Sequence, residues 1–527
     1  MRAFNTTGAC DPLKHYLVDL TDKVHKIKEL VDDGKHFSIS KARRYGKTTT
    51  LSALKKALSK DYTVLSVSFE GLGTEYFETG RAFVRTFLAS MFDEAKDNPL
   101  DVPHEISFQL ATLSADEADT WALYDLMTVL RRWCRASARP FVLIIDCIDT
   151  ATDSQAFRDS LSMLGADFNR RTARHGPALR SVIFSGVEDV RFLPPIAGRE
   201  DNYMENSPFN IASDFPIDMS LSEQGIKGML DDYEADHETG MDTKAVAKAI
   251  REWTNGYPFL VSRICQLLDE RTQKETNPAG AWTTQGVDEA VRLIISKDDT
   301  LLSSLKESLN NYPDLKAAIR SNLMEGMRLP WCPWRKDIVR MRKVGLIRNE
   351  HFTARIDNRL FETMLYDLFL SEAELKGNVF SRQAELSKDR FTANGTLDVP
   401  LLIESFIKTY AETSAPLRDH TFTELFIGRE QFLLYLRASI TGYGSSYVDA
   451  DTRDPMRTDV VVDCLEHTCV IGLRQWRSGI CDEDAEGNLR QYLDVRDIDA
   501  GYQLIFDLNE GTVPEYRQVH AHDTTCD

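Results

Sequence analysis

The sequence has few of the features that would mark a membrane, secreted or metal-scaffold protein. No run approaches the roughly 18 apolar residues that a membrane-spanning helix needs, and the first 20 residues lack a basic segment followed by an apolar one. The nine cysteines include no C-x-x-C pair, and the eleven histidines include no H-x-x-x-H pair. These absences argue against a disulfide framework and a zinc site. We expect a cytoplasmic protein with no membrane partner.

An excess of basic residues is also absent. Lys and Arg total 63 against 82 Asp and Glu, which gives a formal charge of −19. A protein that coats duplex nucleic acid normally presents a basic face. Non-specific nucleic-acid binding by the whole chain is therefore disfavoured, although a local basic groove stays open. At 527 residues the chain exceeds one hydrophobic core, so we expect two to four domains.

Apolar runs and amphipathic segments alternate over the first two hundred residues, which predicts an α/β layer. Short unbroken apolar runs indicate strands buried on both faces of a parallel sheet. We place these strands at 37–40, 64–69, 141–145 and 181–185, with a helix at 48–58.

The following residues are predicted to be mainly helical, with helices at 222–233, 242–254, 258–270 and 284–295 and Ser222 as an N-cap. Residues 300–374 continue helical around a short apolar break at 344–347, which suggests a small winged-helix-like module. The polar stretch 376–394 is interpreted as a linker. Beyond it we expect helices at 401–411 and 422–436, strands at 447–452, 458–464, 468–473 and 501–506, and a helix at 488–494.

The strongest chemical motif lies where the first predicted strand meets its helix. Gly46-Lys47-Thr48 follows the segment Lys41-Ala-Arg-Arg-Tyr. In a phosphate loop (P-loop), the glycine permits close approach of the backbone, the lysine contacts β- and γ-phosphate oxygens, and the threonine hydroxyl ligates Mg²⁺. The usual pattern has a further glycine where this chain has Lys41. The alternative is a surface turn capped by threonines, but a strand before it and an amphipathic helix after it favour a nucleotide site.

An acid ends a later apolar strand. Phe141-Val-Leu-Ile-Ile is followed by Asp146, and such an acid holds the Mg²⁺ shell in P-loop enzymes. The next residue is Cys147, and a thiol is a poor replacement for a carboxylate that orients water. Asp149, two residues on, would share a strand face with Cys147, and we consider it as a substitute catalytic residue. The sequence therefore predicts ATP and Mg²⁺ binding with weak or absent hydrolysis.

Several segments together resemble the prokaryotic AAA-ATPase-like family, over about residues 5–508. They are Tyr16-Leu-Val-Asp, Ala42-Arg-Arg-Tyr-Gly-Lys-Thr-Thr-Thr-Leu, Gly186-Val, Asn206-Ser-Pro-Phe-Asn-Ile-Ala and Gly256-Tyr-Pro-Phe-Leu. In this family a P-loop ATPase region precedes a domain similar to PD-(D/E)XK nucleases, and the first glycine of the P-loop is usually missing.

The resemblance implies several site residues. The P-loop would bind ATP through Arg44, Tyr45, Gly46, Lys47, Thr48 and Thr49, with Thr48 and Asp146 at the metal. Tyr257 and Pro258 belong to a G-x-P turn that would lie near the nucleotide base; a plain helix-breaking turn is the alternative. Ser185, at the end of the fourth predicted strand, would sense the γ-phosphate.

The resemblance also places a nuclease-like core near the C-terminus. That core needs one acid on a strand, then an acid and a lysine two apart on the next strand, where both share a face. Asp459 matches the first acid, but Gly472 and Arg474 replace the other two, and Asn488 replaces an expected glutamine. An arginine stays protonated and cannot act as a base. We therefore expect an inactive nuclease fold, in which Asp459 and Arg474 form either an ordinary cross-strand ion pair or a retained contact to a phosphate backbone.

These observations combine into one expected organisation. A P-loop ATPase-like core spans 1–205, a helical lid 206–299, a winged-helix-like module 300–375 and a nuclease-like domain 395–527. The leading hypothesis is a nucleotide-dependent switch whose C-terminal domain contacts a protein partner or nucleic acid. The alternative is an ATP-regulated nuclease in defence or mobile-element biology, and a scaffold that binds nothing is a third hypothesis. Oligomerisation is left open.

Overall fold

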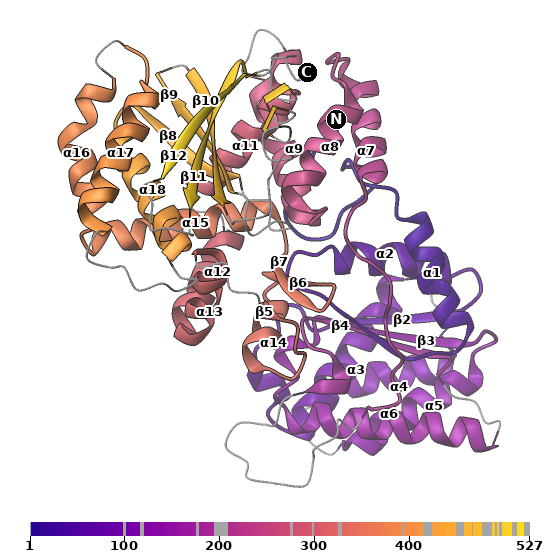
Figure 1. Ribbon diagram of the computed structural model, residues 1–527. Helices are drawn as coiled ribbons and strands as arrows, with labels where there is room; N and C mark the ends of the chain where they lie inside the picture. The colour runs from indigo at the N-terminus through magenta and orange to yellow at the C-terminus, as the bar shows by residue number, and fades with distance from the viewer. Residues whose placement is uncertain are drawn as a thin grey trace. The chain divides into compact units, whose positions relative to one another are not determined.

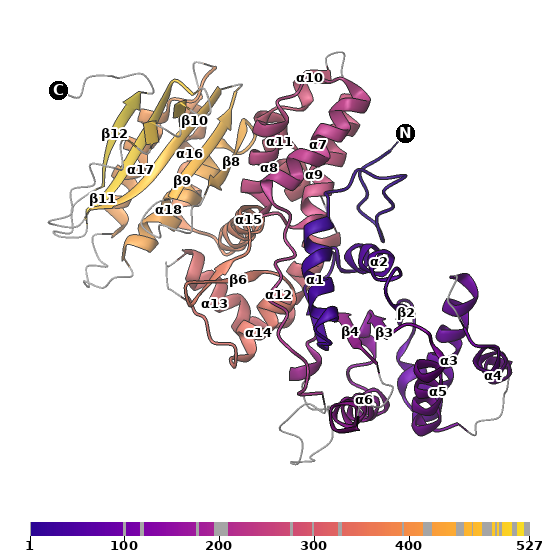
Figure 2. The same ribbon diagram turned by 90° about the vertical axis from the view of Figure 1, so that its right-hand side faces the viewer.

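The computed structural model of the chain describes residues 2–98, 102–115, 121–174, 179–193, 209–273, 278–297, 300–324, 329–392, 395–414, 424–449, 458–465, 467–476, 487, 489–490, 493–494, 498–507 and 514–520 (Figures 1 and 2). The chain divides into two compact units. The first contains residues 1–290 and 343–345, and the second contains residues 291–342 and 346–527. Within the described residues, none of the helices combines the length and apolarity that crossing a lipid bilayer requires.

The first unit is built on a four-stranded parallel sheet in the order β1-β4-β3-β2. The strands are β1 (Phe37–Ser40), β2 (Thr63–Ser68), β3 (Phe141–Asp146) and β4 (Ser181–Gly186). The α/β fold class and all four predicted strands are confirmed, to within one residue at each end. In β3, every side chain is buried, as expected for a strand covered on both faces.

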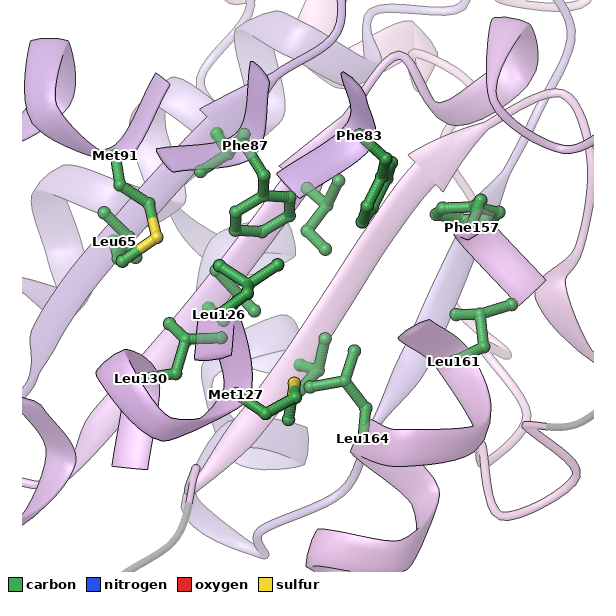
Figure 3. Close-up of a cluster of buried hydrophobic side chains, with 14 of the residues drawn as sticks. Leu65, Phe83, Phe87, Met91, Leu126, Met127, Leu130, Phe157, Leu161 and Leu164 are labelled. Carbon is green, nitrogen blue, oxygen red and sulfur yellow. The ribbon is translucent and has the colours of Figure 1, made fainter. Parts of the chain in front are cut away.

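Helices cover both faces of this sheet because neighbouring strand residues point to opposite sides. Val142 and Ile144 join a core with α1 (Thr21–Asp32) and α2 (Lys47–Leu58). Leu143 and Ile145 join a larger core on the other face, with α3 (Gly80–Asp97), α4 (His104–Ala115), α5 (Leu123–Ala136) and α6 (Gln155–Arg174). Figure 3 shows side chains of this larger core, including Phe83, Phe87, Leu126, Leu130 and Phe157.

A helical region follows the sheet. Its helices are α7 (Glu223–His237), α8 (Thr243–Thr254), α9 (Pro258–Thr272), α10 (Pro278–Ala281) and α11 (Thr284–Ser296). Short 3₁₀ turns lie in the preceding sheet region, at Thr74–Phe77, Ile148–Thr150 and Val190–Phe192. Ser222 accepts a hydrogen bond from the amide of Gly225 and is the N-cap of α7, as predicted. The four longer helices match their predicted positions.

The second unit begins within α11 and continues with α12 (Thr300–Asn311), α13 (Pro313–Met324) and a small antiparallel sheet in the order β5-β7-β6. Its strands are β5 (Leu329–Pro330), β6 (Ile347–Glu350) and β7 (Thr353–Ile356), and α14 (Lys336–Lys343) and α15 (Arg359–Leu375) flank them. The region contains both helices and a β-hairpin, and its assignment as a winged-helix-like module stays a prediction.

A second sheet follows α16 (Val379–Phe391), α17 (Val399–Ser414) and α18 (Glu424–Ile440). The strands are β8 (Gly444–Asp449), β9 (Thr458–Cys464), β10 (His467–Trp476), β11 (Ala500–Asp507) and β12 (Glu515–His520), in the order β12-β11-β10-β9-β8. The linker predicted at 376–394 is wrong: α16 occupies most of it, because buried Phe380, Ala384 and Phe391 give this polar stretch one apolar face. The strand β12 was not predicted.

Candidate functional site

The P-loop connects β1 to α2 through a turn that needs left-handed backbone. Gly46 has φ 74° and directly precedes α2, and Arg44 has φ 60°. Glycine adopts this conformation at little cost. The turn leaves the first amides of α2 without intrahelical partners, and such amides attract anions. The predicted strand–loop–helix context of Gly46-Lys47-Thr48 is therefore confirmed.

Lys47 is held inside this turn. Its Nζ donates hydrogen bonds to the carbonyl oxygens of Lys41 at 2.8 Å and Ala42 at 2.9 Å. Burial lowers the pKa of this ammonium, and the nearby carboxylates of Asp149 and Asp146 oppose that shift. Both partners of the ammonium are neutral carbonyls, so a triphosphate oxygen would be a stronger acceptor at the same position.

Thr48 and Asp146 meet across the ends of α2 and β3. The Thr48 hydroxyl donates to Asp146 Oδ2 at 2.9 Å, and Asp146 Oδ1 accepts the amide of Cys147 at 2.9 Å. The two residues are 98 positions apart in the sequence, and the fold brings together the pair predicted for the metal. A hydroxyl and a carboxylate are the hard oxygen donors that Mg²⁺ prefers, so this pair fits the ion, with phosphate and water completing its shell.

A cavity of about 600 Å³ opens beside the P-loop. This volume lies in the range of small-molecule and cofactor sites. Predicted residues that line it are Arg44, Tyr45, Gly46, Lys47, Thr48, Thr49, Asp149 and Pro258. The N-terminal segment 5–10 lines the cavity too, and its Cys10 amide donates to the Thr49 hydroxyl at 3.1 Å. Sequence reasoning missed this segment, which contains no motif that would identify it.

The G-x-P turn between α8 and α9 packs against the P-loop. The Tyr257 hydroxyl donates to the carbonyl oxygen of Arg43 at 2.6 Å, and the Tyr257 ring meets the Tyr45 ring edge-on with centroids 4.7 Å apart. Pro258 lines the cavity, whereas Tyr257 is fully buried behind the loop. Tyr257 therefore supports the loop backbone.

Ser185 lies within β4, opposite Ile39 of the P-loop strand. Its side chain is fully buried, and its hydroxyl has no hydrogen-bond partner within the described part of the chain. It is not one of the residues that line the cavity. The role of γ-phosphate sensor stays a prediction, because this hydroxyl would first have to be uncovered.

The strand β3 ends at Asp146, so the expectation that Asp149 shares a strand face with Cys147 is wrong. Cys147 adopts φ 57°, and a 3₁₀ turn begins at Ile148. The turn directs Asp149 to the end of β4, where its Oδ1 accepts the amides of Val187 at 2.6 Å and Glu188 at 3.3 Å. Asp149 reaches the cavity, but this carboxylate oxygen already stabilises the backbone that follows β4.

The Cys147 thiol is a protonated neighbour of the site. Burial raises its pKa to about 11, with further contributions from the carboxylates of Asp146 and Glu70. A protonated thiol neither accepts a proton from water nor orients it as a carboxylate does. In the folded chain, Cys147 therefore does not replace the carboxylate that would orient the attacking water.

Glu70 is a cavity residue that sequence reasoning missed. It lies two residues beyond the end of β2, and Phe69 still pairs with β3 through its amide and the carbonyl oxygen of Asp146 at 3.0 Å. The signal was available, because parallel strands present their carboxyl ends at one edge of the sheet. An acid that follows the second predicted strand should lie near the acid that ends the third.

The described residues among those predicted to form a nuclease-like site lie on β9 and β10. In their antiparallel register, Asp459 lies directly opposite Gly472. The Arg474 guanidinium folds back over Gly472, at 3.0 Å from where a Cβ atom would stand, and is 5% exposed. Asn488 lies outside the described residues. The space that a second acidic side chain would need is thus occupied by a buried cation.

Comparisons with known proteins assign no family. No protein-family model and no curated protein matches the sequence. Among solved structures, a Walker-type ATPase of Pyrococcus abyssi has a TM-score of 0.47 and 12% identity, over 69% of this chain and 99% of that one. Cdc6p of Pyrobaculum aerophilum has a TM-score of 0.32 and 13% identity, over 70% and 97%. The RuvB Holliday junction branch migration motor of Thermotoga maritima has a TM-score of 0.32 and 13% identity, over 64% of this chain and 90% of that one. Scores at this level carry no argument about function.

Proposed function

We propose that the chain binds ATP with Mg²⁺ in its P-loop and acts as a nucleotide-dependent switch with slow hydrolysis. The observation that carries this proposal is the meeting of three groups beside one cavity. They are the Lys47 ammonium, the amides at the start of α2 that have no partner within the helix, and the Thr48–Asp146 pair. A triphosphate supplies the charge and the oxygens that these groups require.

Binding would exchange partners at Lys47. Its ammonium would leave the carbonyl oxygens of Lys41 and Ala42 for phosphate oxygens, while Thr48 and Asp146 would hold the metal ion. The bound ion would neutralise part of the phosphate charge. The backbone of the P-loop would then be free to respond, because Lys47 no longer ties its two ends together.

The helical region supplies an element that such a change can move. Tyr257 donates to the Arg43 carbonyl, and the Arg44 guanidinium lies 4.5 Å from the centre of the Phe259 ring. These contacts couple the P-loop backbone to the start of α9. A shift of the loop on binding would therefore bias the position of α9, which is how a bistable element converts ligand binding into motion.

We propose that the C-terminal sheet has a PD-(D/E)XK nuclease-like fold without nuclease chemistry. Its support is the succession of α18, an antiparallel β8-β9-β10 meander and a parallel β10–β11 pair, together with Asp459 opposite Gly472. A strand pair that offers a single acid at this register, with a buried arginine over the opposite glycine, is a poor Mg²⁺ site. The domain would instead contact a protein partner or nucleic acid. An ATP-regulated nuclease remains the alternative function.

Titration of fluorescent ATP, with and without Mg²⁺, tests the proposal on wild type and Lys47→Ala. Wild type should bind, and affinity should fall about tenfold to a hundredfold in the variant, because hydrogen bonds to charged groups contribute about 1.5–3 kcal/mol. Lys56→Ala is the matched control, since this lysine lies on α2 and does not line the cavity. Equal affinity of Lys47→Ala and wild type would refute the proposal.

A further inference from the structure

The cavity contains a carboxylate that the proposed function leaves unassigned. Of the described acidic residues that line it, Asp149 is bound to two backbone amides, whereas Glu70 forms no hydrogen bond or ion pair through its carboxylate. Asp146 lies behind Thr48 with both of its oxygens engaged. Among the described acidic residues that line the cavity, Glu70 is therefore the one whose two carboxylate oxygens are both unengaged.

The backbone places Glu70 beside the position where a catalytic carboxylate is missing. The strands β2 and β3 are parallel neighbours, and Ser68 lies opposite Asp146 in their register. Cys147 directly follows Asp146, and Glu70 lies two residues after Ser68. Both residues therefore lie just beyond the carboxyl ends of adjacent strands.

Local hydrogen bonds fix the backbone of Glu70 and leave its side chain free. The Glu70 amide donates to the Ser68 hydroxyl at 3.2 Å, and the preceding amide donates to the Asp146 carbonyl oxygen. The side chain is exposed and can reach into the cavity or exchange a proton with solvent. A general base needs these two properties, a defined origin and a route for its proton.

We infer that Glu70 orients and deprotonates the attacking water in slow ATP hydrolysis at this site. This inference rests on the proposed function. The water oxygen forms a bond to the γ-phosphorus, and the bond from that phosphorus to the bridging oxygen of ADP breaks. Glu70 accepts one proton of the water and releases it to solvent, so the products are ADP and inorganic phosphate. Glu70 thus has the catalytic role for which the sequence suggested Asp149.

Two measurements on Glu70→Gln test the inference, with Glu78→Gln as the control. Glu78 is an exposed acid a few residues on that does not line the cavity. The first measurement is the single-turnover rate of ATP hydrolysis, which should fall at least about tenfold in Glu70→Gln, because general bases contribute about 10²–10⁴-fold. The control should keep the wild-type rate.

The second measurement needs no turnover. Tight binding of ADP with aluminium fluoride requires a positioned axial water, so Glu70→Gln should weaken it at least fivefold while ATP affinity stays within twofold of wild type. Retention of both the rate and the aluminium fluoride affinity would overturn the role of Glu70 and leave the proposed function standing. Failure of the wild-type protein to bind ATP would instead overturn the proposed function and this inference with it.

Discussion

Replacement of Asp149 by alanine and by asparagine separates a structural role from a catalytic one. The Asp149 carboxylate accepts the amides of Val187 and Glu188, directly after β4. The carbonyl oxygen of Gly186, at the end of the same strand, accepts the amide of Lys41 at 3.1 Å. Asp149 therefore stabilises the backbone against which the P-loop begins.

The magnitude follows from these contacts. A hydrogen bond to a charged group contributes about 1.5–3 kcal/mol, and one of the two bonds is long. Alanine should lower the local opening free energy by about 2–4 kcal/mol, whereas asparagine keeps a neutral acceptor at Oδ1 and should cost about 1 kcal/mol. The absence of a side chain at Gly186 allows the Asp149 carboxylate to come this close, since a Cβ there would lie 2.7 Å from Asp149 Oδ1.

Hydrogen exchange of peptides that cover Val187 and Glu188 is the direct assay. A loss of 2–4 kcal/mol corresponds to exchange that is roughly 30 to 1000 times faster in Asp149→Ala, because each 1.4 kcal/mol is tenfold. Asp149→Asn should change exchange less than about tenfold and leave the rate of ATP hydrolysis near that of wild type. Wild-type exchange in the alanine variant would refute the structural role, and abolished hydrolysis in the asparagine variant would restore the catalytic one.

Two further predictions concern Cys147 and Asp459. With a pKa of about 11, the Cys147 thiol should be alkylated by iodoacetamide at a rate that rises about tenfold per pH unit from pH 7 to pH 10, and bound ATP should protect it; peptide mass spectrometry measures this, and a plateau below pH 9 would contradict the raised pKa. Supercoiled plasmid incubated with the protein and Mg²⁺ or Mn²⁺ should stay intact, because the second acid is replaced by Gly472 beneath Arg474; nicking that Asp459→Ala abolishes would instead support an active nuclease.

Much of the fold could be predicted because the local signals agree with the tertiary structure. The run Phe141–Asp146 is apolar at every position before its acid, and only a doubly covered strand makes use of such a run. Phe37–Ser40 and Ser181–Gly186 include serines, but the side chains of these two strands are buried as well, except that of Ser40, which is partly buried. The stretch 376–394 misled because α16 buries one narrow face in an otherwise polar sequence, and composition alone does not show that periodicity.

The candidate site was predicted where a residue's role depends on its own strand or helix. Lys47, Thr48 and Asp146 belong to this class, since the ends of α2 and β3 bring them together. The geometry of Asp149 could not be predicted, because it depends on the left-handed backbone at Cys147, a residue type that gives no signal for φ 57°. The sequence shows Glu70 as an acid after the second predicted strand, but the strand order, which places β2 beside β3, was needed to put it next to Asp146.

A crystal structure with Mg²⁺ and a non-hydrolysable ATP analogue tests the central claim most directly. The account predicts that the Lys47 ammonium leaves the carbonyl oxygens of Lys41 and Ala42 and contacts the β- and γ-phosphates, while Mg²⁺ lies at the Thr48 hydroxyl with Asp146 in its shell. An analogue bound elsewhere on the chain, with Lys47 still on its two carbonyl oxygens, would contradict the account.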